Sequence, residues 1–164
     1  MIETGSAINW LLESRDPSIV YLTRRDLLNE VEAKLKQIRE KIPLGLKVRA
    51  LLSGQRPDGG FGVHPYAKWI GSHWRLVSLV ELEIPKENKQ AHRAAEVLLW
   101  LSKALRTPTF VVNKLARKHA SVYGNHLGVC CYLGMAEDSR VKLIADSSVG
   151  WQWPDGGWNC DSNP

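Results

Sequence analysis

Gln55-Arg56-Pro57-Asp58-Gly59-Gly60-Phe61 returns 97 residues later as Gln152-Trp153-Pro154-Asp155-Gly156-Gly157-Trp158. Five of the seven positions are identical, and the last position is aromatic in both copies. Proline fixes its own φ, aspartate bonds nearby backbone N–H groups, and glycine accepts a positive φ, so the string is typical of a sharp turn. We expect each copy to reverse the chain at a helix end and to insert its aromatic ring into the core.

The spacing of the two copies predicts repeated helical hairpins. Two units of about fifty residues fit between them, in the upper range of helical repeat periods. A middle copy would follow Leu105, but Arg106 to Phe110 lacks the glutamine and the glycines. The alternative is that Pro-Asp-Gly, a common turn tripeptide, recurs by chance. The return of the longer string at a helix end favours the repeat.

The segments around the turns have helical periodicity. Asp16 and Pro17 predict an N-cap followed by the first residue of a helix. Pro43 predicts the end of an amphipathic helix that begins near Glu30. Further helices are expected over the ranges 66–82, 91–101, 122–135 and, after a cap at Asp138, 141–149. No segment alternates like a β-strand, so we expect no sheet.

Composition and charge indicate an ordinary globular chain. With 164 residues, 44% of them hydrophobic, residues 1–164 are expected to form a single domain. The net charge is +5, but Lys and Arg alternate with Glu over residues 30–41, which indicates a solvated face rather than a nucleic-acid site. No apolar run of about 18 residues and no secretory leader pattern is present. We therefore expect a cytoplasmic protein without a transmembrane segment.

The repeated turn resembles the QW motif, which is the prenyltransferase and squalene-oxidase repeat of squalene-hopene cyclases and related α/α toroids. The resemblance implies an all-α toroid of helical hairpins. It also implies structural roles for Gln55 with Phe61 and for Gln152 with Trp158, in which the glutamine holds helix ends together. The helical segment that ends in Leu22-Thr23-Arg24-Arg25-Asp26-Leu27-Leu28 is similar to small squalene-cyclase-like proteins without assigned activity.

Two features depart from a complete cyclase of this kind. The Asp-x-Asp-Asp acid with which such enzymes protonate their substrate is absent from the sequence. About eight helices are expected, where a closed toroid has twelve. The resemblance therefore implies an incomplete toroid that lacks its carboxy-terminal hairpins. Its open edge is expected to be covered by further hairpins or by a second copy in a two-fold homodimer.

Four side chains near the first turn are candidates for lining a central cavity: His64, Trp69, His73 and Trp74. Aromatic faces attract cations, so such a cavity would suit an apolar isoprenoid-type ligand. The alternative is that these rings pack between helices, which is the more common use of tryptophan.

A metal site is a weaker alternative. His126 and Cys130 are one helical turn apart and share a face, while Cys160 and Asp161 follow the second turn. A buried thiol is more often a small apolar side chain, so we expect neither a metal nor a cofactor. Two functions remain open, and neither has an assigned catalytic residue. One is a terpenoid-cyclase-like protein that binds an apolar ligand, and the other is a noncatalytic helical-repeat binding or interaction module.

Overall fold

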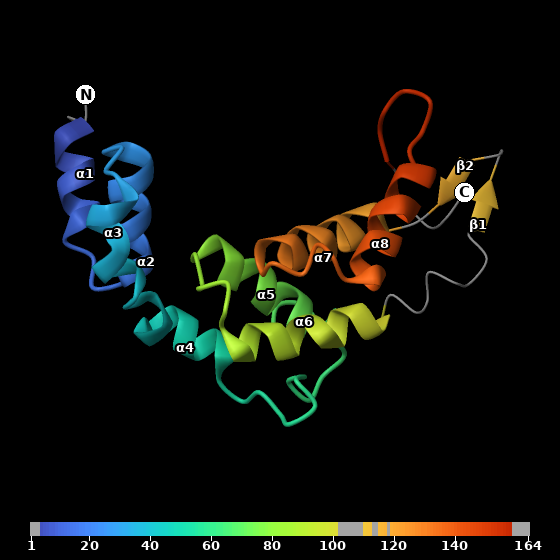
Figure 1. Ribbon diagram of the computed structural model, residues 1–164, viewed down its shortest axis with the longest axis horizontal. Helices are drawn as coiled ribbons and strands as arrows, with labels where there is room; N and C mark the ends of the chain where they lie inside the picture. Colours follow the sequence, from blue (N-terminus) through green and yellow to red (C-terminus); the bar gives the residue numbers. More distant parts are fainter. Residues whose placement is uncertain (1–3, 102–109, 113–114, 118, 159–164) are drawn as a thin grey trace.

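The computed structural model describes residues 4–101, 110–112, 115–117 and 119–158 (Figure 1). Within these ranges the chain forms eight α-helices, which confirms the all-α class: α1 (Thr4–Leu12), α2 (Pro17–Leu22), α3 (Glu32–Arg39), α4 (Leu46–Leu52), α5 (Ser72–Glu81), α6 (Lys89–Leu101), α7 (Ala120–Tyr132) and α8 (Ser139–Gly150). A π-helical turn, η1 (Thr23–Leu27), continues α2, and a 3-10 turn, η2 (Ile42–Leu44), precedes α4. No helix in the described ranges is long and apolar enough to cross a bilayer.

Two short strands correct the expectation that the chain has no sheet. β1 (Phe110–Val112) and β2 (Leu115–Arg117) pair antiparallel, with Phe110 opposite Arg117. Strands of three residues are too short to produce a detectable alternation in sequence. Most of the expected middle turn, 106–110, lies outside the described residues.

The helices follow one another along an open arc (Figure 1). Helices α1, α2 and α3 pack together at one end, and α4 leads from them to α5. There α5 packs on α6 and α7, and α7 packs on α8. The α5–α6 hairpin recurs as α7–α8 about fifty residues later, which confirms the repeated hairpins. Turn 1 (residues 55–61) follows α4, and turn 2 (residues 152–158) follows α8.

Local signals decide several helix boundaries. The side chain of Asp16 accepts a hydrogen bond from the backbone N–H of Ser18 at 3.0 Å, and Pro17 is the first residue of α2. Asp138 accepts in the same way from the N–H of Arg140 at 2.8 Å, at the start of α8. Both predicted N-caps are therefore confirmed. Each cap satisfies one of the backbone donors that a helix leaves free at its first turn.

Helix α5 begins later than its periodicity predicts, at Ser72 instead of residue 66. The intervening residues form turns, in which Ala67 donates to the carbonyl of His64 and Gly71 donates to the carbonyl of Ala67. Gly71 is buried, and a methyl group on it would overlap the backbone of Pro65. This close approach of two backbone segments, which only glycine permits, delays the helix.

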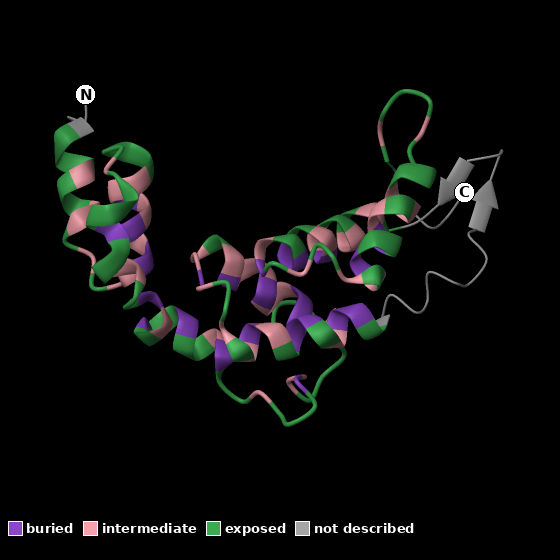
Figure 2. Cartoon of the chain, in the orientation of Figure 1, coloured by how far each residue is buried: buried purple, intermediate pink, exposed green. Residues whose placement is uncertain are grey.

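The core lies between α5, α6 and α7, where the buried residues follow the facing sides of the helices (Figure 2). Ala91, Ala94 and Ala95 of α6 are fully buried, and they pack in one cluster with Leu76 and Leu79 of α5. Small side chains on α6 let the two helices approach closely. Burial of each leucine contributes about 2 kcal/mol to the hydrophobic free energy of folding.

A polar network connects the first helices to the hairpins. Nη1 of Arg25 in η1 lies 2.6 Å from Oε1 of Glu83, which follows α5. The hydroxyl of Tyr132, at the end of α7, donates to the carbonyl of Ile84 at 2.8 Å and to Oε2 of Glu83 at 3.2 Å. Three segments far apart in sequence therefore meet at Glu83.

Candidate functional site

Turn 1 is closed by hydrogen bonds within its own seven residues. The N–H of Arg56 donates to the carbonyl of Gly60 at 2.8 Å, and the N–H of Gly59 donates back to the carbonyl of Arg56 at 2.9 Å. Oδ1 of Asp58 accepts from the N–H of Gly60, and Nε2 of Gln55 donates to the carbonyl of Gly59. The φ of Gly59 is 85°, a left-handed value that favours glycine.

Turn 2 repeats this pattern bond for bond. Trp153 donates to the carbonyl of Gly157, and Gly156 donates to the carbonyl of Trp153, both at 2.9 Å. Oδ1 of Asp155 accepts from the N–H of Gly157, and Nε2 of Gln152 donates to the carbonyl of Gly156 at 2.8 Å. The φ of Gly156 is 86°. The sequence repeat is therefore a structural repeat, in which the glutamine, aspartate and glycines have the same roles twice.

Turn 1 packs against the first turn of α6. Nε2 of Gln55 donates to the carbonyl of Gln90 at 2.8 Å, and Nη2 of Arg93 donates to Oε1 of Gln55 at 3.3 Å. Gly59 is buried there, and a methyl group on it would overlap the carbonyl of Arg93. The turn and the helix are thus in backbone-to-backbone contact, which requires the glycine.

The two aromatic residues have different surroundings. The Phe61 ring is partly buried and lies 4.3 Å from the guanidinium carbon of Arg75, which also donates from Nη1 to the carbonyl of Leu51 at 2.6 Å. In turn 2, Nε1 of Trp158 donates to the carbonyl of Ser148 at 2.7 Å. Leu51 and Ser148 are equivalent, since each precedes its turn's glutamine by four residues. The equivalent helix carbonyl is therefore capped in both repeats, by the guanidinium of Arg75 at turn 1 and by the indole of Trp158 at turn 2.

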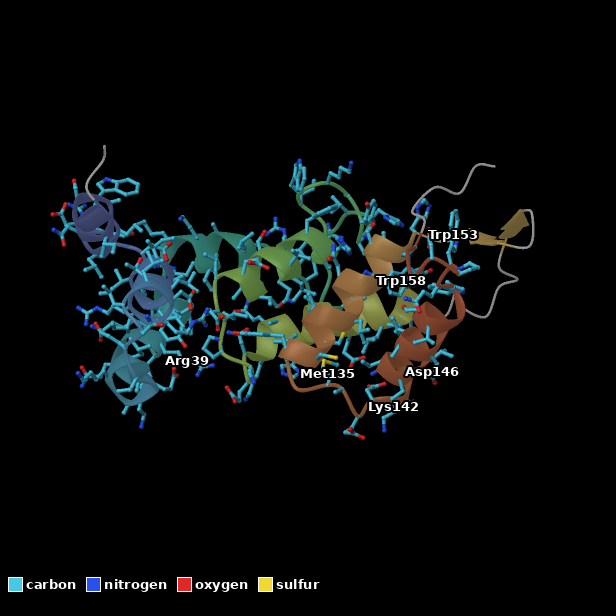
Figure 3. The ribbon with its side chains drawn as sticks, turned by 90° about the horizontal axis from the view of Figure 1, so that it is seen from above. Arg39, Met135, Lys142, Asp146, Trp153 and Trp158 are labelled. Atoms are coloured by element: carbon cyan, nitrogen blue, oxygen red, sulfur yellow. The ribbon has the colours of Figure 1, made fainter. Side chains whose placement is uncertain are left out.

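Among the described residues, no helix packs against turn 2 as α6 packs against turn 1. Gln152 and Gly156 are exposed, and a methyl group on Gly156 would meet only the amide of Gln152 within 4 Å. Trp158 is 50% exposed, so the expectation that its ring enters the core is wrong. Its indole caps the end of α8 instead. Trp153 and Trp158 lie near the carboxy-terminal end of α8, far from Arg39 of α3 (Figure 3).

A second cluster joins α5 to α7 through aromatic rings. The imidazoles of His73 and His126 are 1% and 2% exposed, and their ring centroids are 5.1 Å apart. His73 also contacts the ring of Trp74, which in turn contacts Trp69, with both centroid distances 4.7 Å. Tyr66 packs against His73 at 5.1 Å. Three of the four cavity candidates are therefore brought together in a packed cluster.

Burial holds these imidazoles neutral. Both ring nitrogens of His126, and Nδ1 of His73, have no hydrogen-bond partner among the described residues. Burial, and then the neighbouring imidazole, lower the pKa of His126 to about 3. Burial also lowers the pKa of His73. Nδ2 of Asn125 lies 3.4 Å from Nε2 of His73.

The other candidate residues lie apart from this cluster. His64 is exposed and lines an open cleft with Arg56 and Trp100, between α6 and the segment after turn 1. Cys130 is buried in the core, and burial raises the pKa of its thiol to about 12. Cys160 and Asp161 lie outside the described residues. No three side chains of His, Cys, Asp or Glu gather as a metal site in the described part of the chain.

Sequence reasoning missed Arg75, which is central to turn 1. Its Nη1 caps α4 and its Nε donates to the carbonyl of Ile70, while its guanidinium covers Phe61. One signal was available, because Arg75 is the only charged residue between Gly71 and Val80 in an otherwise apolar and small stretch.

Comparison with models of protein families, with curated proteins and with solved structures found no match for this chain. The interpretation of the site therefore depends on the geometry of the two turns and of the ring cluster.

Gly59 and its equivalent Gly156 provide a test of the contact between turn 1 and α6. Both Gly59→Ala and Gly156→Ala place a methyl group at positive φ, which costs about 1–2 kcal/mol. Only Gly59→Ala also pushes a methyl group into the carbonyl of Arg93, and such overpacking costs about 1–3 kcal/mol more. Urea unfolding should show a larger loss of the free energy of unfolding for Gly59→Ala than for Gly156→Ala. Equal losses of the free energy of unfolding in the two variants would contradict the contact between turn 1 and α6.

The buried imidazoles predict acid sensitivity. The unfolded histidines bind protons below about pH 6.5, whereas the folded ones resist protonation because their pKa values are lowered. The free energy of unfolding should therefore fall as the pH decreases below about 6.5. The contribution of His126 should be up to about 1.4 kcal/mol per pH unit, and that of His73 has the same sign. Urea unfolding between about pH 4.5 and 7 measures the slope.

His126→Phe serves as the diagnostic variant, because it keeps a ring in the cluster and removes the titrating group. It should flatten the dependence of the free energy of unfolding on pH. An unaltered slope in His126→Phe would show that other groups cause the acid sensitivity.

Proposed function

We propose that this chain is one arc of an α/α toroid-type repeat and acts as a noncatalytic interaction module that associates with further copies of itself through turn 2. One observation carries the proposal. Two turns with the same internal hydrogen bonds differ in that turn 1 is seated on a helix and turn 2 is exposed. A turn with the shape of turn 1, and with no helix against its exposed Gly156 in the described part of the chain, favours association.

The toroid part of the proposal is supported by the order of the elements. Each turn follows a helix, and the hairpins α5–α6 and α7–α8 repeat with a period of about fifty residues. The bond from Gln55 to the first turn of α6 agrees with the role that the resemblance to the QW motif implies for this glutamine.

The surroundings of three acids, Asp26, Glu83 and Asp138, support a noncatalytic role. A protonating acid requires a raised pKa, so that it holds its proton near neutral pH. Here a hydrogen bond from Arg25 lowers the pKa of Asp26, and hydrogen bonds from Arg140 lower the pKa of Asp138 to about 2. Glu83 is paired with Arg25. Asp26 and Asp138 are therefore ionised. All three carboxylates serve as partners of arginines.

The surroundings of turn 2 have the apolar character of an interface. Val149, in the last turn of α8, is 71% exposed, and the half-exposed Trp158 donates from its indole to the carbonyl of the preceding residue, Ser148. Gln152 adds a polar group at the same place. An interface typically combines an aromatic anchor with a few hydrogen-bonding groups.

A second candidate function is the binding of an apolar isoprenoid-type ligand. Trp69 and Ile70 are 69% and 52% exposed at the surface of the ring cluster. Exposed rings and aliphatic groups in one place favour an apolar occupant. This function requires no reaction and is compatible with self-association.

Self-association predicts a molar mass that rises with concentration. Sedimentation equilibrium from about 1 to 100 µM should show oligomers of the whole chain, because mass action favours association as concentration rises. Trp158→Glu places a charge in the interface and should give a monomer. Trp69→Glu, which changes a tryptophan that is 69% exposed elsewhere on the chain, is the control and should still associate. A monomer of the unmodified chain throughout this range would refute the proposed function.

The noncatalytic role predicts that purified protein leaves polyprenyl substrates unchanged. Squalene and farnesyl diphosphate incubated with the protein should be recovered intact by gas chromatography and mass spectrometry. Quenching of tryptophan fluorescence by the same compounds, abolished in Trp69→Ala, would support the second candidate. Any cyclised product would contradict the noncatalytic role.

A further inference from the structure

The open cleft between α6 and the segment after turn 1 has an apolar wall. Its volume is about 830 Å³, which is in the range of small-molecule binding sites. Val97 and Trp100 are three residues apart in α6 and so share a face of the helix. Trp100 is 64% exposed, and Val63, from the segment after turn 1, is 40% exposed. An accessible indole beside aliphatic groups favours a ligand that contains an aromatic ring.

Arg56 adds a cation to the cleft that the shape of turn 1 does not require. The internal hydrogen bonds of turn 1 use the backbone of Arg56, and Trp153 makes the same two backbone bonds in turn 2. The guanidinium lies against Gly62, whose φ is 76°, and a methyl group on Gly62 would overlap it. Among the described residues this guanidinium has no ion pair. It is therefore available for a carboxylate, which it can bind through two N–H groups.

His64 and Asp58 add a donor and an acceptor to the same cleft. The backbone N–H of Tyr66 donates to Nδ1 of His64 at 3.1 Å, so a neutral His64 carries its proton on Nε2. Oδ1 of Asp58 accepts from the N–H of Gly60 at 2.8 Å, and its Oδ2 has no hydrogen bond among the described residues. One carboxylate oxygen of Asp58 is thus available for an ammonium group.

The second acid of the cleft already has a partner. Both carboxylate oxygens of Glu96 accept from the guanidinium of Arg140, at 2.6 and 3.0 Å. In the described part of the cleft, Arg56 and Asp58 are therefore a cation and an anion that are paired neither with each other nor with another side chain. A ligand with a single charge would meet one opposite and one like charge, whereas a zwitterion complements both.

We propose that this cleft binds an aromatic α-amino acid. The ligand carboxylate binds the guanidinium of Arg56, with Nε2 of His64 as a further donor. Its ammonium group binds Asp58, and its ring packs against Trp100. The site is formed by α6, turn 1 and the segment after it, so the inference does not depend on self-association through turn 2.

Titration with L-phenylalanine, followed by ligand-observed NMR, tests the site on the purified chain. A ligand of this size in an open cleft is expected to bind with a Kd of about 1 mM. Three analogues each lack one group: 3-phenylpropionate lacks the ammonium, 2-phenylethylamine lacks the carboxylate, and L-alanine lacks the ring. Each should bind about tenfold more weakly or worse, because each loses a charge-assisted hydrogen bond or the ring contact.

A matched pair of arginine variants locates the bound amino acid. Arg56→Gln should weaken the binding of L-phenylalanine about tenfold, because it removes the cation that holds the carboxylate. Arg49→Gln changes an exposed arginine of α4 outside the cleft and should bind like the unmodified chain. If circular dichroism shows that Arg56→Gln is not folded, Arg56→Trp replaces it, because turn 2 has tryptophan at the equivalent position.

Three results would overturn the proposal. The first is that L-phenylalanine does not bind at about 10 mM, which is tenfold above the expected Kd. The second is that 3-phenylpropionate binds as tightly as L-phenylalanine, because the ligand would then need no ammonium group. The third is that Arg56→Gln and Arg49→Gln bind L-phenylalanine equally well, which would place the amino acid outside this cleft.

Discussion

The hydrogen bond from the Gln55 amide to the Gln90 carbonyl links turn 1 to the start of α6, 35 residues further along the chain. Around it, the contact of Gly59 with the backbone of Arg93 holds the turn against the helix. Arg75 completes the arrangement, because its guanidinium caps α4 from α5. Three successive helices, α4, α5 and α6, are thus fixed relative to one another by one turn. The aromatic cluster between α5 and α7 then extends this arrangement to the second hairpin.

Features encoded within a few residues of sequence were predictable. The caps at Asp16 and Asp138 and the internal bonds of both turns involve neighbours at most four positions apart. The late start of α5 was not predictable, because it depends on Gly71 lying against Pro65 rather than on helical periodicity. The strands β1 and β2 were missed for a different reason, since three residues are too few to establish a period.

In the candidate site, too, local features were predictable from the sequence and tertiary contacts were not. The spacing of His126 and Cys130 correctly places them on one side of a helix, but spacing does not say what that side faces. In the structure His126 meets His73 and the aromatic rings, and Cys130 belongs to the apolar core. Similarly, the sequence contains both turns but does not indicate which of them has a helix to bind. That depends on which first helical turns the folded chain brings within reach.

The two turns have the same shape, although only turn 1 packs against a helix in the described structure. Turn 2 makes the same four internal hydrogen bonds as turn 1 without a helix against Gly156 in the described structure. The shape must therefore arise from bonds within the seven residues, and the helix seat is a separate contact. A surface that already has its bound shape loses little conformational entropy on binding. Turn 2 is preorganised in this sense, so an incoming helix would have to order mainly its own side chains. The repeated sequence thus encodes a preformed turn, and in the described part of the chain a helix lies against it at turn 1.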